Sequence, residues 1–419
     1  MSIISQSSSN ENRFKFTVDT FLTRTKVGSF LKQSNASKQK GVPCFSVFKF
    51  IFLMIFTGKN LFMTLERQAE TKEFGKDVVY RFLNSIYINW KRFLLLFSSF
   101  VIKNDIENLT DEKRVNVFIV DDSFFGRMRS KSVEMLSWIH DHAEKGKNKF
   151  KKGFKMLTLG WSDGNTFIPI AFQLLCSSDP KKRLSQMNES IDKRTAGHKR
   201  RMDATKKSPE VMLKMLKEAI DAGVKASYLL FDSWFCHTAT LLSVSKLGLN
   251  TIAMMKKTKK EHFMFNGKAM DIKQIYQSIR KRRGRSKYLA SVLVEVFNNK
   301  GECIPAKIVY VRDRTNRKKW LALISTDSTL DEEEIIRIYG KRWNIEVFFK
   351  MCKSYLSLAK EFQGRSYDMM VAHTTIVFSR YIMLSVENRN NKDLRTFGPL
   401  FYYCCDELQD IKFLEAMQI

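Results

Sequence analysis

The spacing of apolar residues predicts that the first quarter of the chain is helical. Apolar side chains recur at helical intervals in 45–56, 61–69 and 78–86, and each run is too short to span a membrane. The second and third helices are joined by a linker that contains Gly75, and the later one carries Tyr80 and Arg81. Two interpretations stay open: a helix-turn-helix that enters a DNA groove, or ordinary packing within a helical bundle.

From about residue 115 the apolar pattern changes to that of strands. The runs 115–120, 154–161 and 166–174 are short and rich in β-branched and aromatic residues. The last two flank Ser162-Asp163-Gly164-Asn165, a sequence typical of a hairpin turn. These runs predict three antiparallel strands in succession, and the mixture with helices indicates an α/β fold.

Acidic residues follow two of the predicted strands. A helical pattern over 209–222 precedes an apolar strand at 226–231, which leads into Asp232, and the first strand leads into Asp121 and Asp122. Because open sheets place their sites at the carboxyl ends of strands, we expect these side chains to lie close together. Side chains alternate across a strand, so only one of the two adjacent acids can face the site.

A third acid lies in a segment with the spacing Y-x2-R-x3-E-x6-K. The steps of three, four and seven residues are near whole helical turns, so we predict that one helix face carries Tyr339, Arg342, Glu346 and Lys353. Arginine, lysine and tyrosine side chains bind phosphate, here around one carboxylate. An ordinary surface helix with an Arg–Glu ion pair explains the same residue pattern.

Three convergent carboxylates would suit two Mg²⁺ ions, which prefer oxygen ligands and can activate the attacking oxygen and stabilise the leaving oxygen of a phosphodiester. Composition indicates the same substrate, because 72 Lys plus Arg against 43 Asp plus Glu give a net charge of +29. Nucleic acid is therefore the leading partner. Membrane attachment is disfavoured, since the charge is spread along the chain rather than gathered in one amphipathic helix.

Other reactive or charged residues add less. The seven cysteines are odd in number and form no C-x2-C pair, which favours a reducing cytoplasm and no structural zinc. His140 and His142 flank Asp141, where hydrogen bonding is favoured over metal binding. The basic run 181–207 has few large apolar residues, and we interpret it as a solvated surface loop in preference to a specific DNA contact.

The acids and the Y-x2-R-x3-E-x6-K spacing resemble the DDE transposases of bacterial insertion sequences, in the group marked by that signature. The resemblance is best over about residues 113–358. It implies that Asp122, Asp232 and Glu346 are the catalytic, metal-binding triad. Asp122 is preferred to Asp121 because the family's first acid usually precedes Thr or Ser directly. The resemblance also implies DNA phosphate contacts by Tyr339, Arg342 and Lys353, and two Mg²⁺ ions, for which Mn²⁺ could substitute.

The fold implied by the resemblance is a ribonuclease H-like catalytic core, interrupted by a β-rich insertion and preceded by an all-helical N-terminal DNA-binding domain. Strand-like runs at 251–255, 288–297, 307–312 and 320–325 fit the insertion. The expected divisions are 1–110 for the helical domain, 111–250 and 329–365 for the core, 251–328 for the insertion and 366–419 for a helical C-terminal region.

Within the insertion, Trp320 occupies a place where the family can stack a tryptophan on a flipped base, although a buried strand position explains it equally well. The segment 280–287 has six basic residues in eight and could follow a DNA backbone.

The activity implied is cut-and-paste transposition in the bacterial cytoplasm, in association with the nucleoid. A homodimer in a synaptic complex would bind the terminal inverted repeats, cut there and join the ends to target DNA. Two alternatives remain: a catalytically inactive DNA-binding protein or repressor of the same element, and a ribonuclease H-like nuclease without strand transfer. The intact acids favour an enzyme over the inactive protein.

Overall fold

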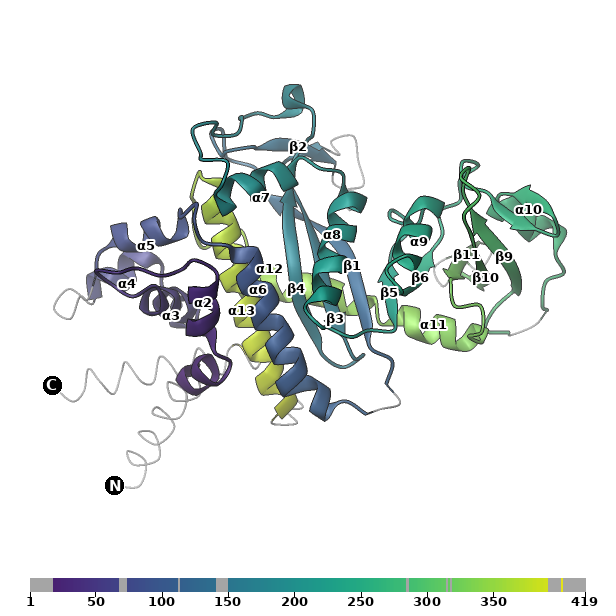
Figure 1. Cartoon of the computed structure of the whole chain (residues 1–419), viewed down its shortest axis with the longest axis horizontal. Coiled ribbons are helices and arrows are strands. Elements are labelled where there is room, and N and C mark those ends of the chain that lie inside the picture. The colour runs from purple at the N-terminus through teal and green to yellow at the C-terminus, as the bar shows by residue number, and fades with distance from the viewer. Residues whose placement is uncertain are drawn as a thin grey trace.

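The computed structural model describes residues 18–67, 74–111, 114–140, 150–283, 286–313, 316, 319–390 and 401. Figure 1 shows a helical region on the left, a central region of long strands flanked by helices, and a β-rich region on the right. One large mixed sheet runs through the last two regions. The predicted α/β class is therefore confirmed.

The N-terminal part of the described chain is helical, as the apolar spacing predicted. Its helices are α2 (Val27–Gln33), α3 (Cys44–Met54), α4 (Leu61–Arg67), α5 (Lys76–Leu83) and α6 (Trp90–Val101). Buried aromatic rings hold them together; for example, the ring centroids of Phe48 and Phe93 are 5.5 Å apart. Residues 68–73, between α4 and α5, lie outside the described residues, and the helix-turn-helix interpretation stays a prediction. Short helical turns occupy Ile55–Thr57, Ile102–Ile106, Glu107–Leu109 and Pro180–Lys182.

The central sheet is built on a long hairpin and two parallel strands. Its strands are β1 (Val117–Gly126), β2 (Ser137–His140), β3 (Phe150–Ser162), β4 (Phe167–Leu175), β5 (Tyr228–Phe231) and β6 (Asn250–Met254). β3 pairs antiparallel with both β1 and β4, as predicted, and β2 is an additional strand on β3 that the sequence did not reveal. β5 runs parallel to β1, and β6 runs parallel to β5. The carboxyl ends of β1 and β5 therefore meet.

The same sheet continues into the β-rich region. Beyond β6 the strands follow the order β11 (Trp320–Ser325), β10 (Cys303–Arg312), β9 (Ala290–Phe297), β7 (Phe263–Phe265) and β8 (Lys268–Met270). The helices of this region are α9 (Thr238–Ser245) and α10 (Ile272–Ser278). Because β6 pairs with both β5 and β11, backbone hydrogen bonds join the region to the central strands.

Helices cover the central strands. They are α7 (Ala196–Ala204), α8 (Ser208–Asp221), α11 (Glu332–Gly340), α12 (Trp343–Ser354) and α13 (Tyr367–Asn390). α6 and α13 lie side by side and both contact β4, while α12 contacts β1 (Figure 1). α13 has the length and composition of a membrane-spanning helix, but its apolar window is entirely buried inside the protein. It is thus packed as a core helix.

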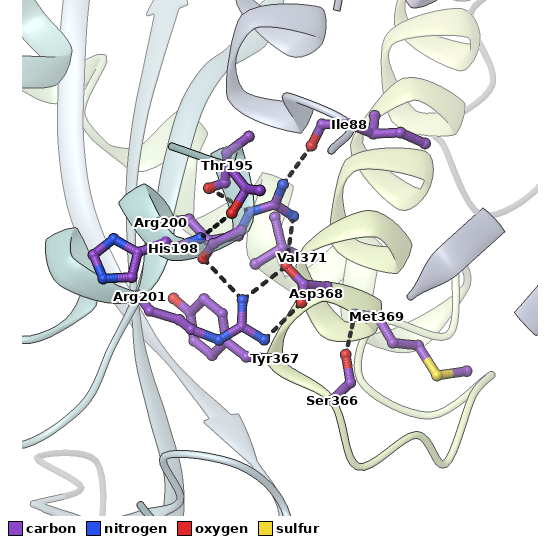
Figure 2. Close-up of polar contacts among 12 residues, drawn as sticks. Ile88, Thr195, His198, Arg200, Arg201, Ser366, Tyr367, Asp368, Met369 and Val371 are labelled. Atoms are coloured by element: carbon purple, nitrogen blue, oxygen red, sulfur yellow. Dashed lines mark hydrogen bonds and ion pairs between the residues drawn. The ribbon is translucent and has the colours of Figure 1, made fainter. Parts of the chain in front are cut away.

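The prediction of a solvated loop is wrong for the second half of the basic run 181–207, because α7 buries two of its arginines there. Arg201 donates to Asp368 Oδ2 at 2.6 Å and to Glu134 Oε1 at 2.7 Å. Arg200 pairs with Asp368 at 3.2 Å and donates to the carbonyl of Ile88. Figure 2 shows both guanidinium groups directed from α7 towards α13. Such buried charges persist only when their partners are well placed, so this network ties α7 to α13 and to the N-terminal helices.

Candidate active site

Parallel pairing brings two of the predicted acids to neighbouring positions. Ile119 of β1 lies opposite Leu230 of β5, so Asp121 and Asp232, each two residues farther on, fall next to each other on the same side. The pKa of Asp121 is raised to about 7, because burial raises it most, the charge of Arg342 opposes the rise and the charge of Asp232 adds to it. The carboxylates are thus close enough to repel each other.

Arg342 connects this pair to the third acid. Its Nη1 donates to Asp121 Oδ2 at 2.8 Å, and its Nη2 donates to Glu346 Oε1. Glu346 lies in the first turn of α12, the helix that contacts β1. The Arg342 side chain is only 16% exposed, so water screens these ion pairs weakly. The structure therefore brings three parts of the chain to one site: β1, the turn between α11 and α12, and the first turn of α12.

The four residues of the Y-x2-R-x3-E-x6-K spacing do not share one helix, and that prediction is wrong. α11 ends at Gly340 and α12 begins at Trp343, because a tight turn intervenes in which the Arg342 amide donates to the Tyr339 carbonyl at 3.0 Å. The backbone at Arg342 keeps right-handed helical angles, so Arg342 still reaches Glu346.

Tyr339 and Lys353 flank Arg342 and Glu346 in the sequence. The Tyr339 hydroxyl is buried and has no hydrogen-bond partner within the described part of the chain. Burial raises its pKa, Arg342 opposes the rise, and the charges of Asp232 and Asp121 add to it. Lys353 Nζ donates to Ser123 Oγ at 2.6 Å. Both residues therefore belong to the surroundings of the acids.

Asp122 makes a different contact from Asp121. Its Oδ2 pairs with Lys155 Nζ of β3 at 2.7 Å, whereas the adjacent Asp121 and Ser123 reach Arg342 and Lys353. This is the alternation expected along a strand. A cleft of about 590 Å³ is nevertheless lined by both aspartates, together with Glu346, Lys155 and Lys353.

Trp320 lies at the start of β11, and its side chain is partly buried. Tyr276 stacks on it with the ring centroids 4.7 Å apart, and Lys257 Nζ lies 4.0 Å from its centroid. Its surroundings are thus aromatic and cationic.

One further side chain of the site, Lys155, was missed in the sequence, and the backbone amide of Trp234 adds a contact that the sequence could not show. Lys155 contacts Asp122, and the Trp234 amide donates to Asp232 Oδ1 at 2.9 Å. Lys155 has no motif of its own, and only the register of the hairpin between β1 and β3 shows which acid it meets. Trp234 is the aromatic residue of the run Leu230-Phe231-Asp232-Ser233-Trp234, on which the family resemblance of the second acid also rests.

The acids have the donor chemistry of a divalent-metal site, although no three His, Cys, Asp or Glu side chains of the described residues form a ready-made one. Arg342 bridges Asp121 and Glu346 instead. Carboxylate oxygens are the ligands that Mg²⁺ prefers. Asp121 and Asp232 repel each other, and the Tyr339 hydroxyl has no hydrogen-bond partner within the described residues. Both features fit a site that binds additional cations and polar groups.

A second cavity, of about 290 Å³, lies away from these acids and is lined by residues of the N-terminal helices, β4, α7 and α8. Its cations largely have partners: Lys91 pairs with Glu218 at 2.7 Å and Lys214 with Asp203 at 2.5 Å. Because lysines already hold the two acids that line this cavity, we assign the chemistry to the acidic cleft instead.

Comparison with known proteins identifies the family of the chain. A family model described as DDE superfamily endonuclease matches residues 53–318, more than half of the 419-residue chain. The match includes Asp121, Asp122 and Asp232 and ends before Glu346. No curated protein matches the chain. The mixed sheet, with β1 antiparallel to β3 and parallel to β5, is consistent with the ribonuclease H-like fold of such nucleases.

Proposed function

This chain belongs to the DDE superfamily endonucleases, and from that premise we propose that it is a transposase of a bacterial insertion sequence. It would bind the terminal inverted repeats, cut the DNA there in a metal-dependent step and join the ends to target DNA. The observation that carries the proposal is the bridge by which Arg342 holds Glu346 to Asp121, beside Asp232. It supports a single site made from Asp232, Glu346 and one of the two adjacent aspartates that the sequence singled out.

The contacts favour Asp121 as the first acid, where the sequence favoured Asp122. Asp121 interacts with Asp232 and Arg342, whereas Asp122 pairs with Lys155. We therefore propose Asp121, Asp232 and Glu346 as the metal ligands and catalytic residues. Asp122 would keep Lys155 at the edge of the cleft.

Two Mg²⁺ ions, or Mn²⁺ in their place, would activate the attacking oxygen and stabilise the leaving oxygen. The chain's own residues would position the DNA. Arg342 would exchange one of its carboxylate partners for a phosphate, to which it can offer two parallel hydrogen bonds. Lys353, near Ser123, would add a second positive charge, and Tyr339 would give its unpartnered hydroxyl to a phosphate or water.

The remaining parts of the proposal concern binding and assembly. The net charge of +29 supports double-stranded DNA as the partner. The helical part, expected over 1–110, would bind the repeats, and the β-rich part, expected over 251–328, would act as an insertion in the ribonuclease H-like core. A homodimer would hold two ends together in the bacterial cytoplasm, at the nucleoid. Trp320 would contact a base within the β-rich part.

The test is cleavage of a labelled duplex that bears the terminal repeats flanking the gene, with Mg²⁺, with Mn²⁺ and with EDTA. We expect metal-dependent ends with a 3′-hydroxyl, and products joined to a target plasmid. Glu346→Gln and Asp121→Asn should lower the cleavage rate by more than about 100-fold, since each removes a metal ligand. Asp122→Asn is the matched control and should keep most of the activity.

Other outcomes decide between the alternatives. Binding of the repeats without cutting, by a wild-type protein that is folded and loaded with metal, would favour an inactive DNA-binding protein or repressor. Cutting without joined products would favour a nuclease. If Asp122→Asn abolishes cleavage and Asp121→Asn does not, Asp122 is the first acid and our assignment fails.

A further inference from the structure

An exposed tryptophan lies directly beside the acids. Trp234, two residues after Asp232, is 43% exposed, and its amide donates to the Asp232 carboxylate at 2.9 Å. Lys155 Nζ lies 4.8 Å and Lys256 Nζ 5.4 Å from the centre of its ring. A large aromatic surface with two cations close by offers both a stacking face and phosphate contacts.

The same alternation continues away from the acids. Lys257, the neighbour of Lys256, places its Nζ 4.0 Å from the Trp320 ring centre. Trp320 stacks on Tyr276, and Lys281 Nζ lies 4.9 Å from the Tyr276 ring centre. We call this row the lysine–aromatic stripe; its members are Lys155, Trp234, Lys256, Lys257, Trp320, Tyr276 and Lys281. It leads from the acidic cleft, through Lys155, into the β-rich region.

We propose that the lysine–aromatic stripe binds a single DNA strand next to the cut, with Trp234 stacking on the base nearest the acids. This inference rests on the proposed function for the identity of the nucleic acid. Aromatic rings stack on bases whose faces are free, as in a single strand, and lysines follow the phosphates between them. A duplex keeps its base faces covered by neighbouring pairs.

The hydrogen bond from the Trp234 amide to Asp232 gives the stripe a positioning role. A base stacked on Trp234 is held at the residue whose amide orients the second acid. Lys155 connects the same ring to Asp122 at the wall of the cleft. The phosphate next to that base therefore lies close to the acids, where small errors in position greatly slow the reaction.

The test measures binding of a fluorescein-labelled single strand of about 12 nucleotides, a length that such grooves can hold. Fluorescence anisotropy would give the Kd in EDTA for the full-length wild type and its variants. We expect Trp234→Ala to bind about fivefold or more weakly, from the loss of one stacking contact, and Trp234→Phe to retain most of the affinity. Lys256→Gln should make the slope of log K against log salt shallower by about 0.7, as expected for one lost phosphate contact.

Trp138→Ala is the matched control, because Trp138 is 45% exposed and has Lys152 Nζ 5.6 Å from its ring centre, but lies on β2 outside the stripe. Its affinity should not change. The inference is overturned if Trp234→Ala binds the single strand as the wild type does, or if Trp138→Ala weakens binding equally. It is also overturned if a duplex of the same length binds as tightly and loses as much affinity with Trp234→Ala.

Binding in EDTA requires no cleavage, so the two proposals can fail separately. A wild-type protein that never cuts, yet binds the single strand through Trp234, would overturn the transposase activity and leave the stripe intact. A protein that cuts normally while Trp234→Ala leaves its single-strand binding unchanged would overturn the stripe alone.

Discussion

Replacing Asp121 by asparagine should stabilise the metal-free protein, and increasingly so as the pH rises. In the folded protein the Asp121 pKa lies at about 7, against an ordinary value of 3.8. Ionised Asp121 is therefore disfavoured by folding, and the wild type loses stability as the pH rises from about 4 to about 7. Asparagine does not ionise, so the variant escapes this loss.

The size of the effect follows from the two pKa values. Each pH unit between 3.8 and about 7 corresponds to about 1.4 kcal/mol, which gives about 4 kcal/mol above pH 7. The Asp121 side chain is 16% exposed to the cleft, and solvent there lowers our expectation to about 2–4 kcal/mol. For a chain of 419 residues, an unfolding entropy of about 2 cal/mol/K per residue converts this to a rise of roughly 2–5 °C in Tm.

The assay is thermal unfolding in EDTA at about pH 5 and about pH 8, chosen on either side of the Asp121 pKa. The difference in Tm between Asp121→Asn and the wild type should be less than half its full size at the lower pH and should reach its full size at the higher one. Asp122→Asn is the control; it loses the ion pair with Lys155, worth about 1 kcal/mol or less, and should give no gain. An Asp121→Asn variant with the same Tm difference at both pH values would refute the reasoning.

Two further predictions concern the scaffold. Arg201→Met should lower the free energy of unfolding by about 3–5 kcal/mol in chemical denaturation, because it leaves the buried Asp368 carboxylate with less compensation; a loss under about 1 kcal/mol would show that Arg200 suffices. Gly160→Ala should cost at least about 1–3 kcal/mol, because the new β-carbon would collide with the buried ring of Phe167. Its control, Gly340→Ala, has open space and no positive φ, so the same assay should show no loss of stability for it.

Much of the fold could be predicted from periodicity. The helical N-terminal part, the antiparallel order of β1, β3 and β4, and the strand β5 before Asp232 all follow from local apolar patterns. β2 and α7 were missed. α7 carries three Lys or Arg residues and one histidine within nine residues. Such a segment is expected to be solvated as long as its partners Glu134 and Asp368 are unknown. Those partners are distant in the chain, so no local pattern reports them.

The candidate site was predicted as a group of residues but not as a geometry. The sequence singled out Asp232, Arg342, Glu346 and the adjacent pair of aspartates. It could not tell which aspartate faces the other acids, because that depends on the register between β1 and β5. The sequence also predicted a single helix from Tyr339 to Lys353, because the helical period is nearly unchanged across the short turn after Gly340.

The sequence by itself determined the class of fold, the basic charge and the residue types available for chemistry, because these depend on local spacing and composition. The tertiary structure alone decided that Arg342 bridges Asp121 and Glu346, that Asp122 meets Lys155, and that lysines flank Trp234. Each of these contacts joins segments far apart in the chain. The pairing of strands and the packing of α12 on β1 fix such contacts, and both arise from burial of apolar surface over the whole domain.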